Sequence, residues 1–285
     1  MLQLLSVTLS QTFTVIGIPD TQNYSQSFPE IFRAQTQWVS EQQVVRDIQF
    51  VSHYGDVVNC GDQLDQWANA KSALDLLDAT NIPWGVSAGN HDIKPYCGGD
   101  DVYIPQFFAE RYGPTKWEDE PYFLACSPSG MSNAQIFSAG GWDFLWLHLE
   151  CDVPTREMVW AQSILDQHRD RVAVLTTHRY MQDAEDYTAG VPVVPSGRFP
   201  DIWYTFEGIY ADGGNRAEDI FRWLVRRNPS ICMVNCGHFH EEFRQTSTNV
   251  NGLPVHEVLA DYQDDPNGGD GWLEEGGGRH ERPSF

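Results

Sequence analysis

Five groups of polar side chains are spaced along this sequence, and each directly follows a short apolar run. They are Asp20 with Gln22, Asp62 with Asp65, Asn90 with His91, His178, and His238 with His240. Carboxylate, amide and imidazole groups bind divalent cations such as Mn, Fe, Zn and Co. Two such cations can act together on one phosphoryl group. The residue types therefore predict a site for two metal ions.

The segment 57–65 (VVNCGDQLD) is predicted to hold the central ligand of that site. Val57 and Val58 end an apolar run that is typical of a buried strand, and Gly61 allows a sharp turn after it. Asp62 should then project from the end of the strand, where each of its oxygens can contact a different cation. A lone Gly-Asp pair is more often only a turn, so this interpretation depends on the other four groups.

The elements that must position these groups are strands alternating with helices. Expected strands cover residues 13–18, 49–59, 82–87, 171–177 and 231–235. Apolar residues recur at helical spacing in 28–50, 67–78, 105–112, after Pro154, and in 217–227. This alternation predicts a parallel-type α/β sheet with its chemistry at the carboxyl ends of the strands. An alternating stretch at 135–149 predicts a hairpin of a second sheet, and 255–259 a further strand.

Two long segments are rich in Gly, Pro, Asp and aromatic residues: 97–128 is expected to form a lid or rim over the site, and 180–214 either a substrate rim or irregular surface. The aromatic stretch 203–210 could stack a base or an aryl group, or simply pack under its own loop. We expect one domain over residues 1–273, followed by a Gly-rich polar tail over 274–285.

Composition narrows the class of protein. Hydrophobic residues make up 41% of the 285 residues, as expected for a globular domain. The net charge of -22 repels phosphate backbones, so a large nucleic acid is not expected as a partner. No run reaches the roughly 18 apolar residues that a membrane span needs, and residues 1–11 lack the basic start of a secretion signal. We expect a soluble protein without a clear signal peptide, and export stays open.

The six cysteines form no C-x-x-C pair and no zinc-finger spacing. Cys60, Cys232 and Cys236 lie in apolar runs, where a cysteine is most often a small buried hydrophobe. Cys97 and Cys126 lie in polar segments and are the pair that we consider for a disulfide.

The five groups, in this order, resemble the motifs of the calcineurin-like metallophosphoesterase superfamily. Those motifs are D-x-H, G-D-x-x-D, G-N-H-[DE], a lone His, and G-H-x-H, and the match runs over residues 13–240. The resemblance implies an α/β fold, a four-layer α/β/β/α sandwich of two mixed sheets flanked by helices. It also implies two divalent metal ions, with Mn, Fe, Zn or Co as candidates.

Carried over by position, the resemblance implies a role for each group. One metal would be held by Asp20, Gln22, Asp62 and His240, and the other by Asp62, Asn90, His178 and His238. A hydroxide that bridges the metals would attack phosphorus, and His91, oriented by Asp65, would protonate the leaving oxygen.

Two departures from the motifs bear on metal and substrate. Gln22 stands where the superfamily usually has His, and an amide oxygen is a weaker ligand than imidazole for these ions. The first motif with Gln22, together with the stretches 261–263 and 268–273, resembles a bacterial-type branch of the calcineurin-like phosphoesterases whose substrate is poorly defined. Gln66 follows Asp65 where Ser/Thr protein phosphatases carry Arg, which disfavours a phosphomonoester dianion or a phosphoprotein. Asp65 also stands where purple acid phosphatases place a Tyr ligand.

The resulting hypothesis is a dinuclear metal-dependent phosphoester hydrolase that cleaves a small-molecule phosphodiester, with phosphomonoesters as the second choice. Two alternatives stay open: a non-catalytic metal-binding or scaffolding protein that keeps the fold, and a nuclease, which the charge disfavours. The remaining residues of interest are expected to be structural or exposed: His53 and His148 structural, His168, His256 and His280 at the surface, Arg179 facing solvent, and Asp92 not a ligand.

Overall fold

The computed structural model of the chain describes residues 12–98, 102–183, 196–200, 213–275 and 278–280. The apolar run 1–11 and the aromatic stretch 203–210, which the sequence singled out, lie outside these residues.

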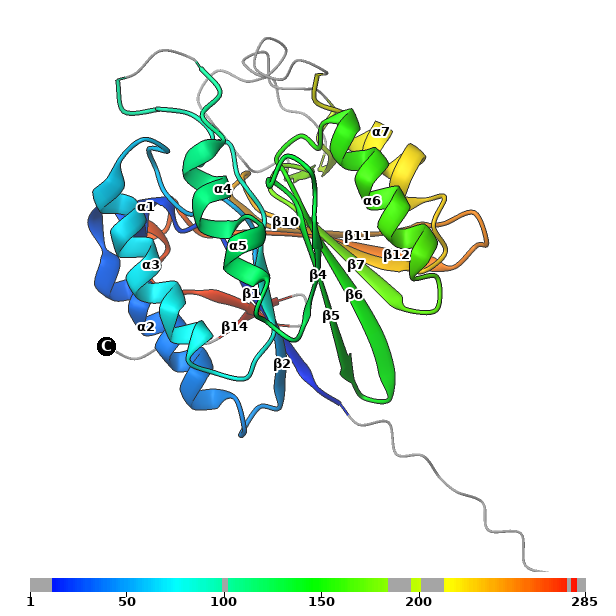
Figure 1. Cartoon of the computed structure of the whole chain (residues 1–285), viewed down its shortest axis with the longest axis horizontal. Coiled ribbons are helices and arrows are strands. Elements are labelled where there is room, and N and C mark those ends of the chain that lie inside the picture. The colour runs from blue at the N-terminus through cyan, green and yellow to red at the C-terminus, as the bar shows by residue number, and fades with distance from the viewer. Residues whose placement is uncertain (1–11, 99–101, 184–195, 201–212, 276–277, 281–285) are drawn as a thin grey trace, which may run out of the picture.

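The first of two facing sheets carries the N-terminal strands (Figure 1). Its order is β14-β13-β1-β2-β3, with β1 (Thr14–Ile18), β2 (Ile48–His53), β3 (Trp84–Val86), β13 (Leu273–Glu275) and β14 (Gly278–His280). β1, β2 and β3 run parallel, and β13 is antiparallel to β1. The carboxyl ends of the parallel strands therefore lie at one edge of this sheet.

The second sheet has the order β11-β12-β10-β7-β6-β5-β4. Its strands are β4 (Phe123–Cys126), β5 (Asn133–Ala139), β6 (Trp142–Leu149), β7 (Val172–Thr177), β10 (Ile231–Cys236), β11 (Glu241–Thr248) and β12 (Pro254–Asp261). β6, β7, β10 and β12 run parallel to one another, and antiparallel strands flank them at both edges. A short pair, β8 (Met181–Gln182) and β9 (Gly197–Arg198), lies apart from both sheets.

Helices cover the outer face of each sheet (Figure 1). On the first sheet these are α1 (Gln22–Ser27), α2 (Pro29–Gln42), α3 (Leu64–Asp78), α4 (Gln106–Tyr112) and α5 (Pro114–Trp117). On the second are α6 (Thr155–Gln167) and α7 (Ala217–Ile220), which continues as the π-helical turn η1 (Phe221–Val225). The short α8 (Pro266–Gly269) precedes β13. The expected four-layer α/β/β/α sandwich is confirmed. No helix within the described ranges is long and apolar enough to cross a membrane.

Aromatic side chains fill the layer between the two sheets. The ring of Phe50 stacks on Trp146 with centroids 4.4 Å apart and on Phe137 at 4.8 Å. Val174 from β7 belongs to the same cluster. Because Phe50 comes from the first sheet and the others from the second, this cluster fixes one sheet against the other.

Two buried histidines also link elements inside the sandwich, as expected for structural residues. His148 has Nε2 at 2.9 Å from Ser52 Oγ and Nδ1 at 2.9 Å from Gln135 Oε1. His53 has Nε2 at 2.9 Å from Thr21 Oγ1. Both rings are fully buried, and each is hydrogen-bonded at Nε2 to a hydroxyl. His256 is exposed and His168 half-buried, whereas the side chain of His280 lies outside the description.

The strand expected over residues 49–59 ends earlier, at His53. Gly55 has a φ of 100° and Asp56 a φ of 49°, so the backbone turns there instead of continuing as a strand. Val57 and Val58 are buried, as their apolar character suggests, but they pack in the loop beyond the turn. The residues that directly follow β2 are therefore those from Tyr54 to Asp56, and not those after residue 59 as expected from the sequence.

Two other boundaries differ from the expectation. The helical region 28–50 ends as α2 at Gln42, and Ile48 already begins β2. The segment from residue 274, expected to be a polar tail, contributes Glu274 and Glu275 to β13, opposite Gly17 and Ile16 of β1.

Candidate metal centre

The turn after β1 carries two buried oxygen atoms that have no hydrogen-bond partner. Asp20 is 3% exposed, and its Oδ1 accepts the backbone N–H of Gln22 at 2.9 Å. Asp20 Oδ2 and Gln22 Oε1 are both buried and have no partner among the described residues. The Nε2 of Gln22 donates to Gln263 Oε1. A buried oxygen without a partner costs free energy unless a cation or water meets it, so this turn fits a cation.

Asp56 connects three of the loops at the strand ends. Its side chain is buried, and Oδ1 accepts the backbone N–H of His91 at 2.8 Å. Its Oδ2 lies 3.0 Å from His178 Nε2. Its backbone carbonyl accepts the N–H of Thr21 at 3.1 Å. The loops after β1, β3 and β7 therefore all contact this one residue of the loop after β2.

Two imidazoles complete a group with Asp56. His178 follows β7 and has Nδ1 2.9 Å from the carbonyl oxygen of Tyr54. Because a carbonyl only accepts, Nδ1 donates to it, and Nε2 is the nitrogen that could contact a metal. His238 Nδ1 lies 3.2 Å from that Nε2. Asp56, His178 and His238 each offer a ligand atom, all within 4.8 Å of one another.

The loop after β3 presents one more amide oxygen and an imidazole. Asn90 donates through Nδ2 to the hydroxyl of Tyr96 at 3.0 Å, and its Oδ1 is buried without a partner in the described chain. His91 has Nδ1 2.7 Å from the carbonyl oxygen of Asn59, and its ring stacks on Tyr96 with centroids 3.8 Å apart. Nε2 of His91 is then the nitrogen available to a substrate.

The loop after β10 and the end of β12 bring the last groups. His240 has Nδ1 2.6 Å from Asp264 Oδ2 and a side chain that is 20% exposed. Asp261, at the end of β12, is buried and interacts electrostatically with His240, His178 and Asp56. The sequence did not single out Asp261 as a functional side chain.

The charges of this cluster shift its pKa values. Burial, with the charges of Asp56 and Asp261, raises the pKa of Asp20 well above its usual value. Burial raises the pKa of Asp261 to about 7. Burial acts to raise the pKa of Asp56, but the imidazoles of His178 and His91 outweigh it and lower that pKa. The fold has thus gathered buried carboxylates that repel one another, which is an environment that cations relieve.

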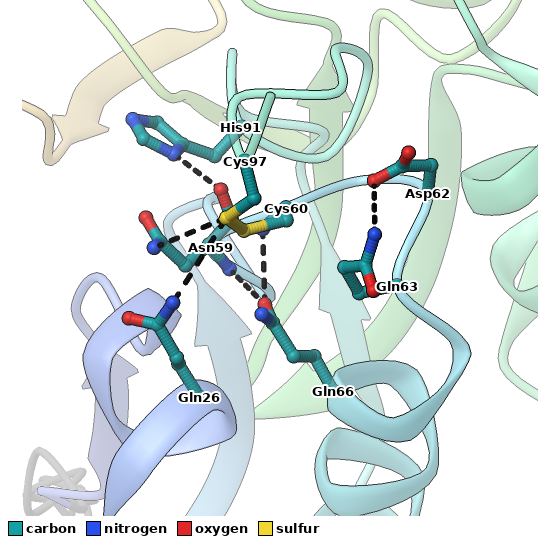
Figure 2. Close-up of a disulfide and its surroundings, with 8 residues drawn as sticks. All are labelled: Gln26, Asn59, Cys60, Asp62, Gln63, Gln66, His91 and Cys97. Carbon is teal, nitrogen blue, oxygen red and sulfur yellow. Dashed lines mark hydrogen bonds between the residues drawn. A yellow bond between two sulfur atoms is a disulfide. The ribbon is translucent and has the colours of Figure 1, made fainter. Parts of the chain in front are cut away.

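Asp62 and Asp65 are not brought to this cluster. Asp62 is half-buried and accepts a hydrogen bond from Gln63 Nε2 at 3.0 Å, and Figure 2 shows this contact apart from His91. Asp65 is exposed in the first turn of α3. The ring of His91, which Asp65 was expected to orient, is held by Asn59 instead.

The early end of β2 explains the difference. The segment Gly55-Asp56-Val57-Val58-Asn59 fits the same G-D-x-x-D motif as Gly61 to Asp65, except that Asn59 replaces the closing Asp. It directly follows the buried strand, and that position is the signal that could have identified it. We therefore assign to Asp56 the place that the sequence analysis gave to Asp62.

A disulfide joins Cys60 to Cys97, with Cα atoms 5.6 Å apart, inside the range for such bonds. The pair considered from the sequence, Cys97 with Cys126, does not form: Cys126 is a free, half-buried thiol in β4. Cys60 is buried, as expected, but it is cross-linked and not a simple hydrophobe.

This disulfide lies beside the imidazole of His91 (Figure 2). Cys60 directly follows Asn59, whose carbonyl contacts the ring, and Cys97 directly follows Tyr96, which stacks on it. The cross-link therefore ties together the two segments that hold His91.

Two other residues near the cluster are structural. Arg179 was expected to face solvent, but it is 2% exposed and forms an ion pair with Asp152. Asp92 accepts the backbone N–H groups of Val58 at 3.1 Å and Gly89 at 2.8 Å, so it fixes the loops, in keeping with the role expected for it.

The family model for calcineurin-like phosphoesterase matches residues 13–242. This chain belongs to the calcineurin-like phosphoesterase family. A relative from Bacillus subtilis (strain 168), "Uncharacterized protein YvnB", is 30% identical over 267 residues, which are 92% of this chain and 18% of that protein. The chain thus spans less than a fifth of that relative's length.

Solved structures with a similar fold include a dimetal phosphatase from Danio rerio, with 13% identity, a TM-score of 0.48, and coverage of 87% of this chain and 86% of that one. A purple acid phosphatase from yellow lupin (Lupinus luteus) has 14% identity and a TM-score of 0.47. The match covers 92% of this chain and 45% of the phosphatase chain.

Membership of the family supports metal-dependent phosphoester hydrolysis and a centre of two divalent cations. The donor set fits that centre: it combines imidazole nitrogens with carboxylate and amide oxygens that have no partner among the described residues.

Proposed function

We propose that this domain hydrolyses small-molecule phosphodiesters at a centre of two divalent metal ions. The observation that supports it is a set of three buried oxygens, on Asp20, Gln22 and Asn90, that have no partner in the described part of the chain and lie around the carboxylate–imidazole group of Asp56 and His178. Two cations, when bound, would neutralise phosphoryl oxygens and activate a water molecule.

The residues divide into two sets around Asp56. Asp20, Gln22 and His240 would hold one ion, Asn90, His178 and His238 the other, and Asp56 would contact both. His91, fixed at Nδ1 by Asn59, would carry a proton on Nε2 to the leaving oxygen of the ester. The stacked ring of Tyr96 excludes water from one side of that imidazole.

The preference for a diester depends on the absence of a positively charged side chain at the position where Ser/Thr protein phosphatases have Arg. With Asn59 in the place of the closing Asp, the residue at the phosphatase Arg position is Cys60, whose sulfur is bonded to Cys97. Gln66, which the sequence analysis placed there, accepts the N–H groups of Asn59 and Cys60 at 3.0 and 2.9 Å. Neither side chain can pair with the second charge of a monoester dianion.

The test compares two substrates on one preparation. The Mn-loaded domain is assayed with an aryl phosphodiester and the matching aryl phosphomonoester. A charge-assisted hydrogen bond contributes about 1.5–3 kcal/mol, so its absence should leave kcat/KM for the monoester at least about tenfold lower. A strong preference for the monoester would reverse the assignment of substrate class.

Elemental analysis of the same preparation distinguishes the non-catalytic alternative. Fewer than one metal per chain after loading with Mn, with no hydrolysis of either ester, would favour a binding or scaffolding protein. Nuclease activity is disfavoured by the net charge of -22, and a digest of single-stranded DNA tests it.

A further inference from the structure

The amide of Gln22 poses a problem that an imidazole does not. One end of an amide is a carbonyl oxygen that can bind a cation, and the other is an NH₂ group that cannot. A glutamine ligand works only if something decides which end faces the metal. Building on the proposed metal centre, we propose that Asp261 and Gln263 form a relay that orients Gln22 so that its Oε1 faces that centre.

The relay begins at Asp261, a buried carboxylate at the end of β12. Its Oδ1 accepts the backbone N–H of Gln263 at 3.0 Å, and its Oδ2 lies 3.5 Å from Gln263 Nε2. An ionised carboxylate only accepts hydrogen bonds, and in that state Asp261 selects the NH₂ end of the Gln263 amide. The carbonyl end of Gln263 then points the other way.

The second step passes this polarity to Gln22. Oε1 of Gln263 accepts a hydrogen bond from Gln22 Nε2. That contact uses the NH₂ end of Gln22 and leaves its Oε1 buried without a partner, in the same turn as the unpaired Oδ2 of Asp20. One carboxylate therefore determines, through two amides, which atom of Gln22 is presented.

Asn90 provides a contrast inside the same site. Its Nδ2 donates to the hydroxyl of Tyr96 at 3.0 Å. A hydroxyl can donate as well as accept, so this contact does not by itself fix the orientation of the amide. The relay that ends at a carboxylate does, and it serves the position where the family usually has a histidine.

The experiment measures Mn content and Mn affinity of four proteins: wild type, Gln263→Leu, Gln22→His and the double variant. Residues that orient a metal ligand contribute about 10- to 100-fold to affinity, so Gln263→Leu should weaken one of the two Mn sites at least about tenfold. In the Gln22→His background, where no amide needs orienting, the same substitution should change affinity less than about threefold.

Each outcome has a defined meaning. Wild-type affinity in Gln263→Leu would overturn the relay while leaving the metal centre intact. Equal losses in both backgrounds would also overturn it, because Gln263 would then act only through packing. A wild-type protein that binds no Mn would overturn the proposed function itself.

Asp261→Asn provides a second variant that keeps the size of the side chain. An asparagine can donate as well as accept, so the polarity of the relay is no longer fixed. We expect an affinity loss smaller than that of Gln263→Leu. Wild-type Mn affinity in this variant would count against Asp261 as the source of the polarity.

Discussion

Two Gly-Asp turns lie six residues apart in this chain, at Gly55-Asp56 and Gly61-Asp62, and they have opposite surroundings. The first follows β2 directly, and its aspartate is buried against His178. The second lies farther along the loop, and its aspartate is half-buried against its own neighbour Gln63. The same dipeptide is a candidate metal ligand in one place and an ordinary turn in the other.

The glycines show why the two turns are not interchangeable. A Cβ on Gly55 would lie 2.8 Å from atoms of the His178 side chain, and Gly55 has a φ of 100°. A Cβ on Gly61 would lie 2.7 Å from the backbone oxygen of Asp92. Gly55 thus lets Asp56 approach an imidazole, whereas Gly61 lets the loop pack against backbone. Distance from the end of the strand decides which aspartate can reach the ligands.

The largest effect is expected from Asp56→Asn. Loss of a residue that only orients a ligand costs about 10- to 100-fold, so loss of this shared ligand should lower kcat/KM on an aryl phosphodiester at least about 100-fold. Metal content should fall below that of the wild type. Activity assays and elemental analysis on the same batch measure both, and near-normal values for both would remove Asp56 from the centre.

The next effect is expected from breaking the disulfide with Cys97→Ser. A cross-link of this sequence separation stabilises a fold by about 2–4 kcal/mol, so the free energy of unfolding should fall by that amount. Activity should also fall, with Mn content unchanged, because the segments that hold His91 are no longer tied together. Urea unfolding and kcat/KM are the measurements.

Cys126→Ser is the matched control for that variant, because Cys126 is a free thiol of similar chemistry away from His91. Its stability and activity should equal those of the wild type in the absence of reductant. If both cysteine variants lost activity to the same extent, the disulfide would have no special role in positioning His91.

A smaller effect is expected from Tyr96→Phe. The ring still stacks on His91, but the hydroxyl that accepts from Asn90 is lost. One hydrogen bond contributes about 0.5–1.5 kcal/mol, so Mn affinity should fall about two- to tenfold. A titration with Mn measures it. An unchanged affinity, with a large loss of kcat, would mean that Tyr96 acts on His91 and not on the metal ligand.

Much of the fold could be predicted because the spacing of apolar residues shows which segments form buried strands and which form helices that pack on them. Runs such as those around Val172 and Ile231 became central strands, and their tips carry His178 and His238 as expected. The end of β2 could not be predicted in the same way. Val57 and Val58 are as apolar as a strand, and only the positive φ angles at Gly55 and Asp56 separate them from it.

The parts of the site that were missed are those that the local sequence does not encode. Gln263 contacts Gln22 from 241 residues away, and no local pattern shows that the two side chains meet. Cys60 lies in an apolar run, so its partner in a polar loop was not apparent. Asp56 was missed for another reason: the complete motif with its closing Asp occurs at Gly61 to Asp65, whereas the copy after β2 ends in Asn59.

The smallest effect is expected from Asp62→Asn, and it tests the comparison most directly. Asp62 is half-buried, and its hydrogen bond to Gln63 can be kept by an asparagine oxygen. Surface changes of this kind alter stability by about 0.5 kcal/mol or less, so kcat/KM and Mn content should stay within about twofold of the wild type. The assay is the one used for Asp56→Asn, so the two isosteric changes differ only in position. A loss of metal from Asp62→Asn as large as that from Asp56→Asn would mean that the loop closes over the centre when cations bind, and that distance from the strand end does not select the ligand.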